Sequence, residues 1–210
     1  MKLFFSIIGA ATFLLSHTSY CQNSEKNLSF NGGLNLAYPT FIYFNEESFE
    51  KSIPSYQLGF NKDFFSKRAW GLSLSVNLSK NSFNAGRQVG SFYSIKQLDL
   101  SYLSVEGGAS YRIPIKNIAF WCSTNLRLGR LIAQNYNDYY TVPALKSSDI
   151  GLNFRLGCEI MSIPSRPYLL LNYYYGLSKI AENSVTTGNG QTLNDYIRNR
   201  TIGVQIGFHF

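Results

Sequence analysis

Strict alternation of apolar with small or polar residues runs through several long segments of this chain of 210 residues. It is clearest in three runs, residues 70–79, 150–160 and 202–210. The apolar face of the last run consists of Ile202, Val204, Ile206, Phe208 and Phe210. Because successive side chains of a β-strand point to opposite faces, this pattern predicts strands with one apolar face. Each run also reaches the roughly 9–11 residues that a tilted strand needs to cross a bilayer.

Weaker alternation fills the rest of the chain, in residues 28–38, 55–64, 97–113, 118–130 and 167–178. Together with the three clear runs, these segments predict eight strands. Within residues 97–113 the alternation changes phase, because Leu98, Leu100 and Tyr102 share one face and the apolar positions from Leu103 onward lie out of step. We therefore expect a β-bulge near Tyr102–Leu103 that returns the apolar side chains to one face.

The connections between the predicted strands alternate strictly in length. The short ones are residues 65–69, 114–117 and 161–166, and the long ones are residues 39–54, 80–96, 131–147 and 179–197. Both ends of the chain then lie on the side of the short turns. Outer-membrane barrels have short periplasmic turns and long extracellular loops. The sequence thus predicts an all-β fold, an eight-stranded antiparallel up-and-down transmembrane β-barrel.

The composition of the face opposite the apolar one distinguishes this fold from a soluble barrel. A soluble barrel would present that face to water and would carry many Lys and Glu there, whereas this face is mainly Gly, Ser, Asn and Gln. Such side chains fit inside a narrow barrel. Aromatic residues gather toward the strand ends, as expected of interfacial girdles. The turn side has Phe64, Phe65, Trp70, Tyr111, Phe120, Tyr168 and Phe210, and the loop side has Tyr38, Tyr173 and Tyr175.

The N-terminus has the features of a secretion signal. Lys2 is followed by the apolar stretch 3–15, which is too short to span a bilayer as a helix. We expect cleavage between Cys21 and Gln22, and the alternative is a lipidated Cys21. The predicted organisation is a signal peptide over residues 1–21, a lead-in over 22–27 and an outer-membrane barrel over 28–210.

The formal net charge of +7 raises the question of nucleic-acid binding. The basic residues are scattered along the chain, and no stripe collects them as a phosphate-tracking surface would require. We therefore expect no nucleic-acid partner. Attraction to anionic lipid headgroups at the membrane rim is the secondary role that we expect of these residues.

Two cysteines remain beyond the predicted signal peptide, Cys122 and Cys158. Neither has CxxC spacing or a histidine companion, and the chain has no phosphate loop or calcium loop, so we expect no metal and no cofactor. The predicted register places the two cysteines opposite each other on the lipid face. We expect reduced thiols, and the alternative is a disulfide.

The closing segment, residues 200–210, resembles the C-terminal strand of bacterial outer-membrane proteins. The resemblance implies that the barrel-assembly machinery recognises Phe208 and Phe210 during insertion. Residues 102–105 and 111–114 resemble the middle strand of the small PorT-like barrels of Bacteroidota, although Glu106 stands where that family often has proline. This second resemblance implies an outer-membrane location and a role beside protein secretion or cell-surface complexes.

A charge cluster is predicted inside the barrel. Pairing the strands about the turn at 114–117 places Glu106 beside Asn125, and pairing about the loop near residue 139 places Asn125 beside Arg155 and Arg127 beside Asn153. Buried charges must be paired and hydrogen-bonded, so the set is self-consistent. We expect salt bridges that fill the lumen, and the alternative is a gated narrow channel.

The remaining candidate surface is the set of long loops, where Tyr136, Tyr139 and Tyr140 have the composition of adaptable binding sites. The only histidine beyond the signal peptide is His209, a weak candidate for a general base. We therefore expect a non-enzymatic protein that binds a surface or forms a cell-envelope complex through its loops or periplasmic rim. Its expected partners are membrane lipids, the assembly machinery and envelope proteins. The alternatives are a channel for ions or small solutes and, third, a lipid-modifying enzyme.

Overall fold

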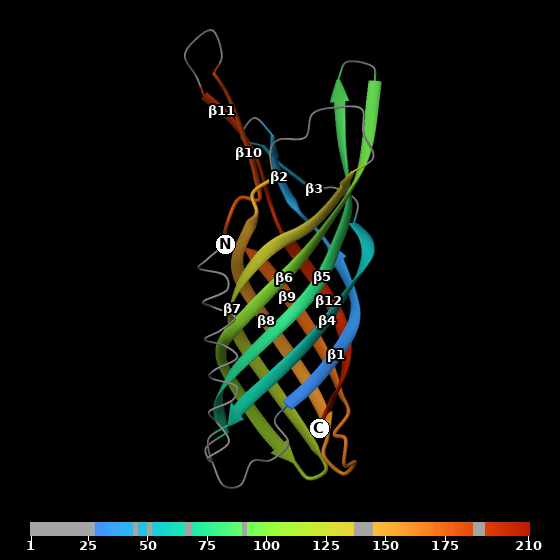
Figure 1. Cartoon of the computed structure of the whole chain (residues 1–210), viewed down its shortest axis with the longest axis vertical. Helices are drawn as coiled ribbons and strands as arrows, with labels where there is room; N and C mark the ends of the chain where they lie inside the picture. The colour runs from blue at the N-terminus through green and yellow to red at the C-terminus, as the bar shows by residue number, and fades with distance from the viewer. Residues whose placement is uncertain are drawn as a thin grey trace.

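The computed structural model describes residues 28–43, 46–49, 52–65, 69–89, 92–136, 145–186 and 192–210. Eight antiparallel strands close into a barrel (Figure 1). They are β1 (Leu28–Ala37), β4 (Ser52–Phe65), β5 (Trp70–Val89), β6 (Phe92–Ile115), β7 (Ile118–Tyr136), β8 (Ser148–Ile160), β9 (Tyr168–Gly176) and β12 (Arg200–His209). Neighbours follow chain order, and β1 pairs with β12 to complete the ring. The predicted eight-stranded up-and-down barrel is confirmed.

Within the described ranges, no helix is long and apolar enough to cross a bilayer.

The long connections contain more strand than the sequence predicts. Four short strands, β2 (Thr40–Tyr43), β3 (Glu46–Phe49), β10 (Ala181–Thr186) and β11 (Thr192–Arg198), form a second sheet in the order β10-β11-β2-β3. This sheet lies beyond the loop end of the barrel (Figure 1). Strands β5 and β6 also remain paired out to Val89 and Phe92. A hairpin satisfies its backbone groups by cross-strand bonding and needs no apolar face, so alternation alone does not reveal it.

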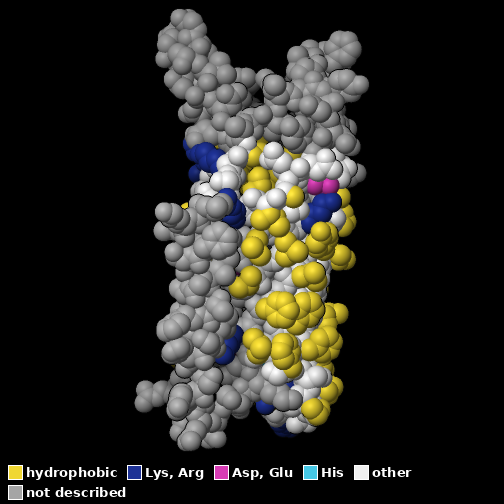
Figure 2. All heavy atoms as spheres, in the orientation of Figure 1, with side chains coloured by type: hydrophobic (Ala, Val, Ile, Leu, Met, Phe, Trp, Pro, Cys, Tyr) yellow, Lys and Arg dark blue, Asp and Glu magenta, His cyan; other side chains and the backbone are white. Residues whose placement is uncertain are grey.

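The two faces of the barrel wall have opposite chemistry. The outward side chains are mainly apolar: Leu156 is 61% exposed and Ile206 58%. Figure 2 shows hydrophobic side chains over the visible wall of the barrel. The inward side chains are Ser, Asn, Gln and a few charges, such as the fully buried Asn31 and Asn153. This is the reverse of a soluble barrel, and it is the arrangement of a barrel whose outer wall contacts lipid.

The predicted β-bulge in β6 is wrong. Strand β6 pairs with β5 without interruption, and Leu98, Leu100 and Tyr102 face the interior together with Ser104 and Glu106. The inner face therefore changes from apolar to polar along one unbroken strand. An irregularity does occur at this level, where β6 pairs with β7, but the extra residue is Ile132 of β7.

Two further predictions about single side chains are corrected. Tyr168 is buried in the lumen and does not belong to the turn-side girdle. Cys122 pairs with Leu156, and Cys158 pairs with Phe120, so the two thiols are not opposite each other and both are free. The offset arises because the register of β7 and β8 across a long loop is not fixed by that loop's sequence.

Close strand approach makes Gly108 a sensitive position in the wall. A Cβ there would overlap the backbone oxygen of Thr124, whereas a Cβ on Gly129 would have its nearest neighbour, the backbone oxygen of Asp149, at 3.5 Å. Gly108→Ala should therefore lower the free energy of unfolding by about 1–3 kcal/mol. Gly129→Ala is the matched control and should have a much smaller effect. Urea unfolding in lipid vesicles measures both, and equal stability of the two variants would contradict this packing.

Candidate functional site: the charged lumen and its closure

Three neighbouring strands bring one carboxylate and two guanidiniums together inside the barrel. Glu106 lies on β6, Arg127 on β7 and Arg155 on β8, each at a position whose alternation points it inward. Their exposed fractions are 1%, 1% and 3%. We call Glu106, Arg127 and Arg155 the lumen triad.

The strand register that aligns the triad differs from the predicted one. Glu106 pairs directly with Arg127, Asn125 pairs with Asn153, and Arg155 pairs with Ser123. The pairs Asn125–Asn153 and Arg155–Ser123 join β7 and β8 across a long loop, whose sequence does not fix the register. For Glu106 and Arg127 the reason lies in the turn after β6. This is a two-residue turn at Lys116 and Asn117, with Lys116 at a positive φ of 53°, and not the predicted turn over 114–117. Moving the turn centre by one residue moves each partner by two positions.

The carboxylate of Glu106 is the centre of the triad. Its Oε2 accepts a charge-assisted hydrogen bond from Arg155 Nη2 at 2.5 Å and a second from Asn153 Nδ2 at 2.8 Å. Its Oε1 lies 3.9 Å from Arg127 Nε. Two guanidiniums thus share one carboxylate, and the pairing offsets the cost of burying these charges.

The neighbouring strands supply the remaining acceptors for the two guanidiniums. Arg155 donates to Asn61 Oδ1 at 3.0 Å and to Ser75 Oγ at 3.1 Å. Arg127 donates to Ser79 Oγ at 2.8 Å and lies over the ring of Tyr174, with 4.6 Å from its Cζ to the ring centroid. The network therefore connects β4, β5 and β9 to the triad across the lumen. Sequence reasoning missed these partners because they lie on strands distant in the chain.

Asn125 is buried nearby but belongs to a separate network. It donates to Ser123 Oγ at 3.0 Å and accepts a hydrogen bond from Ser73 Oγ. The structure therefore brings Glu106, Arg127, Arg155 and Asn153 into one cluster and leaves Asn125 beside it.

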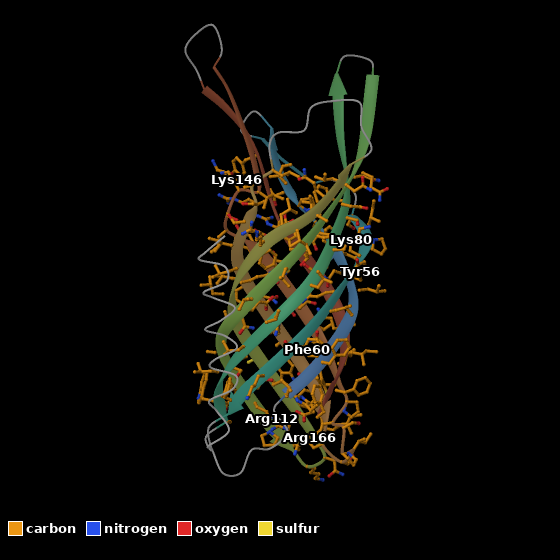
Figure 3. All side chains as sticks on the ribbon, in the orientation of Figure 1. Tyr56, Phe60, Lys80, Arg112, Lys146 and Arg166 are labelled. Carbon is orange, nitrogen blue, oxygen red and sulfur yellow. The ribbon has the colours of Figure 1, made fainter. Side chains whose placement is uncertain are left out.

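A second charge cluster occupies the turn end of the lumen. Glu159 Oε2 accepts from Arg112 Nη2 at 3.0 Å, while Arg166 Nη1 and His209 Nε2 each lie 4.0 Å from Glu159 Oε1. Figure 3 shows Arg112 and Arg166 close together at that end. The ring of His209 packs against Tyr168, with 5.0 Å between centroids. In the sequence, Glu159 occupies a position of the alternating run 150–160 that points inward, and this position could have indicated the cluster.

The loop end of the lumen is closed by a hydrophobic plug. Its buried side chains are Ala37, Phe83, Leu98, Leu100, Tyr102 and Ile180. Leu131, Leu145 and Ile197 pack against them. The plug lies beyond the triad, since Tyr102 precedes Glu106 by four residues on β6 and both point inward. The described side chains thus meet inside the lumen at three levels: a charged turn end, the triad and an apolar loop end.

The other predicted site residues lie at the two ends of the barrel. Tyr136 is the last residue of β7 and pairs with Leu98, whereas Tyr139 and Tyr140 lie outside the described residues. Phe208 and Phe210 face outward at the turn end, and the Phe210 backbone N–H donates to Leu28 O at 2.9 Å. In the described part of the chain, no group of three or more His, Cys, Asp or Glu side chains is placed to hold a metal.

No protein-family model and no curated protein sequence matches the chain. Among solved structures, the chain is similar to the outer membrane protein OprG from Pseudomonas aeruginosa, with a TM-score of 0.55 and 11% identity over 87% of this chain and 95% of OprG. At this identity the likeness shows a shared fold, that of a small outer-membrane-type barrel.

Two further similar structures have TM-scores below 0.5 and add no weight. AlkL, solved in lipid bilayers, scores 0.45 at 12% identity over 92% of this chain and 96% of AlkL. Neisserial surface protein A scores 0.44 at 14% identity over 86% of this chain and 97% of its own.

The geometry of the triad predicts a strong effect of removing its single carboxylate. Glu106→Gln keeps the side-chain volume but removes the carboxylate that pairs with both buried guanidiniums, so the free energy of unfolding should fall by about 3–5 kcal/mol. Ser110→Ala is a matched lumen control, because Ser110 Oγ is buried and has no hydrogen-bond partner among the described residues, and it should cost less than about 1 kcal/mol. Urea unfolding in vesicles compares them. Equal costs for the two variants would show that the triad is not a stabilising network.

Proposed function

We propose that this chain is a non-enzymatic outer-membrane protein whose closed barrel anchors a binding surface built from its long hairpins. The proposal rests on the contrast between the inside of the barrel and the long connections. The described side chains form clusters at three levels of the lumen, whereas the long connections form a sheet of four strands beyond the barrel. A filled barrel is suited to anchoring, and the extramembrane sheet is the part available to a partner.

The membrane placement is supported by the outward apolar wall and by the fold shared with OprG. We propose that the turn end faces the periplasm and the loop end faces outward, which fits the turn-side position of Phe208 and Phe210. The same proposal includes export by a cleaved signal peptide over residues 1–21, insertion by the barrel-assembly machinery and a place among the PorT-like barrels. The first 27 residues lie outside the described part of the chain.

The sheet has the form that strand-addition partners recognise. Its order leaves β10 and β3 as edge strands within the described residues. An edge strand presents backbone N–H and C=O groups that an extended segment of another protein can pair with. We therefore propose a protein partner in the cell envelope as the ligand of this sheet.

The side chains in the lumen give less support to the alternative function, a channel for ions or small solutes. The triad is paired to itself and to neutral side chains, and Phe83, Leu100 and Tyr102 obstruct the loop end. A conducting path would require both the lumen triad and the hydrophobic plug to move. For the enzyme alternative, His209 is only 8% exposed, and its ring lies between Tyr168 and Glu159 at the turn end of the lumen. We accordingly keep the protein outside the enzyme class.

The proposal predicts that partner capture depends on the hairpins and not on the lumen. Cross-linking in native envelopes, followed by purification, should capture a partner with the wild type and with Glu106→Ala. It should capture little or none when residues 41–49 or residues 183–195 are replaced by short turns, because these changes remove part of the sheet. A change at the opposite end, Arg166→Gln, is the control for the periplasmic rim.

Two results would contradict the proposal. Loss of capture in Arg166→Gln with both hairpin variants unaffected would move the binding surface to the periplasmic rim. Steady single-channel conductance that changes in Glu106→Ala or Arg127→Ala would instead place the protein among channels.

A further inference from the structure

The extramembrane sheet continues the seam at which the barrel closes. Strands β2 and β11 pair in the same register as β1 and β12, because Ala37 pairs with Thr201 and, three residues further, Thr40 pairs with Arg198. Strand β10 follows β9, the other neighbour of β12, and pairs with β11. The sheet of β10, β11, β2 and β3 thus rises directly from the barrel strands β9, β12 and β1 (Figure 1). We call this sheet the flap.

Three of the four connections between the barrel and the flap are interrupted at one level. The breaks are residues 38–39 between β1 and β2, residue 199 between β11 and β12, and residues 177–180 between β9 and β10, while residues 50–51 lie outside the described part of the chain. Backbone bonds place the three breaks side by side: Tyr38 N–H donates to Arg200 O and Gly176 N–H donates to Asn199 O, both at 2.7 Å. Pro39 has no N–H, so it cannot donate to the ladder. A line of residues outside the strands is where a hinge would lie.

The base of the flap carries part of the hydrophobic plug. Ile197 lies on β11, and the fully buried Ile180 directly precedes β10 and donates its N–H to Ile197 O at 2.8 Å. Both side chains pack in the plug with Leu100 and Tyr102, which belong to the barrel strand β6. The plug therefore joins side chains of the barrel wall to side chains of the flap. A rotation of the flap about the hinge line would separate these two groups.

A buried carboxylate of the barrel wall holds the flap at this level. Asp149 lies on the inward face of β8 and is 1% exposed. Its Oδ1 accepts a hydrogen bond from Ser178 Oγ at 3.1 Å, and its Oδ2 accepts one from Asn199 Nδ2 at 2.9 Å. Ser178 precedes β10 and Asn199 follows β11. One side chain of β8 thus binds both legs of the β10–β11 hairpin.

The donors that Asp149 uses suit a reversible attachment. The Ser178 hydroxyl accepts a hydrogen bond from Ile150 N–H at 2.8 Å, which orients its own hydrogen toward Asp149. Ser178 and Asn199 are neutral, whereas Glu106 and Glu159 pair with buried guanidiniums. Hydrogen bonds to a carboxylate are stronger than those between neutral groups, but water can replace a neutral donor without leaving a buried charge unpaired.

We propose that the flap is a hinged lid over the loop end of the lumen and that Asp149 is the latch that holds it closed. In the closed position Ser178 and Asn199 bind Asp149, and Ile180 and Ile197 complete the plug. Opening breaks both hydrogen bonds and uncovers the barrel side of the plug, while the lumen triad stays in place. The inference goes beyond the proposed function and does not depend on it. A protein that pairs with β10 would act on the lid through the same hairpin.

Thiol labelling measures how often the lid opens. Leu100→Cys supplies a buried reporter on the barrel side of the plug, in a Cys21→Ser/Cys122→Ser/Cys158→Ser background reconstituted into lipid vesicles. A water-soluble methanethiosulfonate reagent reacts with this thiol while the lid is open. Asp149→Ala removes both latch bonds and should raise the labelling rate about tenfold or more, which corresponds to a shift of about 1.4 kcal/mol in the closing equilibrium.

Two controls separate the latch from a general loosening of the barrel. Glu159→Ala also removes a buried inward carboxylate of β8, but at the turn end, and it should leave the labelling rate unchanged. Ser110→Cys is a second buried reporter, placed toward the turn end, and it should stay protected in Asp149→Ala. A difference in gel mobility between boiled and unboiled protein shows that each variant retains a closed barrel.

The flap side of the latch gives an independent variant. Ser178→Ala/Asn199→Ala should accelerate labelling as Asp149→Ala does, and combining the two should add little, because the three residues act as one unit. This double variant decides the matter if Asp149→Ala does not form a closed barrel.

Three results would overturn the proposal. They are rapid labelling of Leu100→Cys with the latch intact, equal rates with and without the latch in closed barrels, and an equal acceleration in Glu159→Ala or at Ser110→Cys. None of these measurements uses a protein partner, so a failure of partner capture would affect the proposed function alone.

Discussion

The structure depends on the closure of the barrel by hydrogen bonds between β1 and β12, which pair from Ser29–His209 to Ala37–Thr201. Closure leaves no free edge in the wall, so its backbone groups are satisfied within the sheet, as a bilayer requires. It also divides each strand into an inward and an outward face. The outward face can then be mainly apolar, and the inward face must accommodate most polar side chains of the wall in a narrow space. The lumen triad meets that demand by pairing its buried charges.

The same division explains how much of the molecule the sequence could predict. Alternation predicted the eight strands because one face of each is apolar, and the run ending at Phe210 shows this most clearly. Alternation gave a wrong prediction, a β-bulge, in β6, where Leu98, Leu100 and Tyr102 are apolar but point inward to the plug. The inward position of the charges that meet in the lumen follows from the alternation, but their pairing does not. The turn at Lys116 and Asn117 decides the register of β6 and β7, and a long loop leaves the register of β7 and β8 open. The sheet of β2, β3, β10 and β11 lacks an apolar period and left no such signal.

The inside and the outside of the wall thus have separate tasks in this account. The lumen holds paired charges and an apolar closure, which stabilise the barrel and obstruct a path through it. The outer wall meets lipid along its apolar rows. In the proposed function, the hairpins beyond the rim engage a protein partner. Each task depends on the inverted arrangement of polar and apolar side chains.

Native Cys122 is well placed to test this arrangement, because it lies on the outward face of β7 level with Leu156. A spin label is attached there in a Cys21→Ser/Cys158→Ser background, in protein reconstituted into lipid vesicles. Electron paramagnetic resonance then compares collisions of the label with oxygen, which partitions into the bilayer, and with a water-soluble nickel complex. If the outer wall contacts lipid, the label has high oxygen and low nickel accessibility. High nickel accessibility with little oxygen contact would place this wall in water and would show that its apolar face does not meet a bilayer.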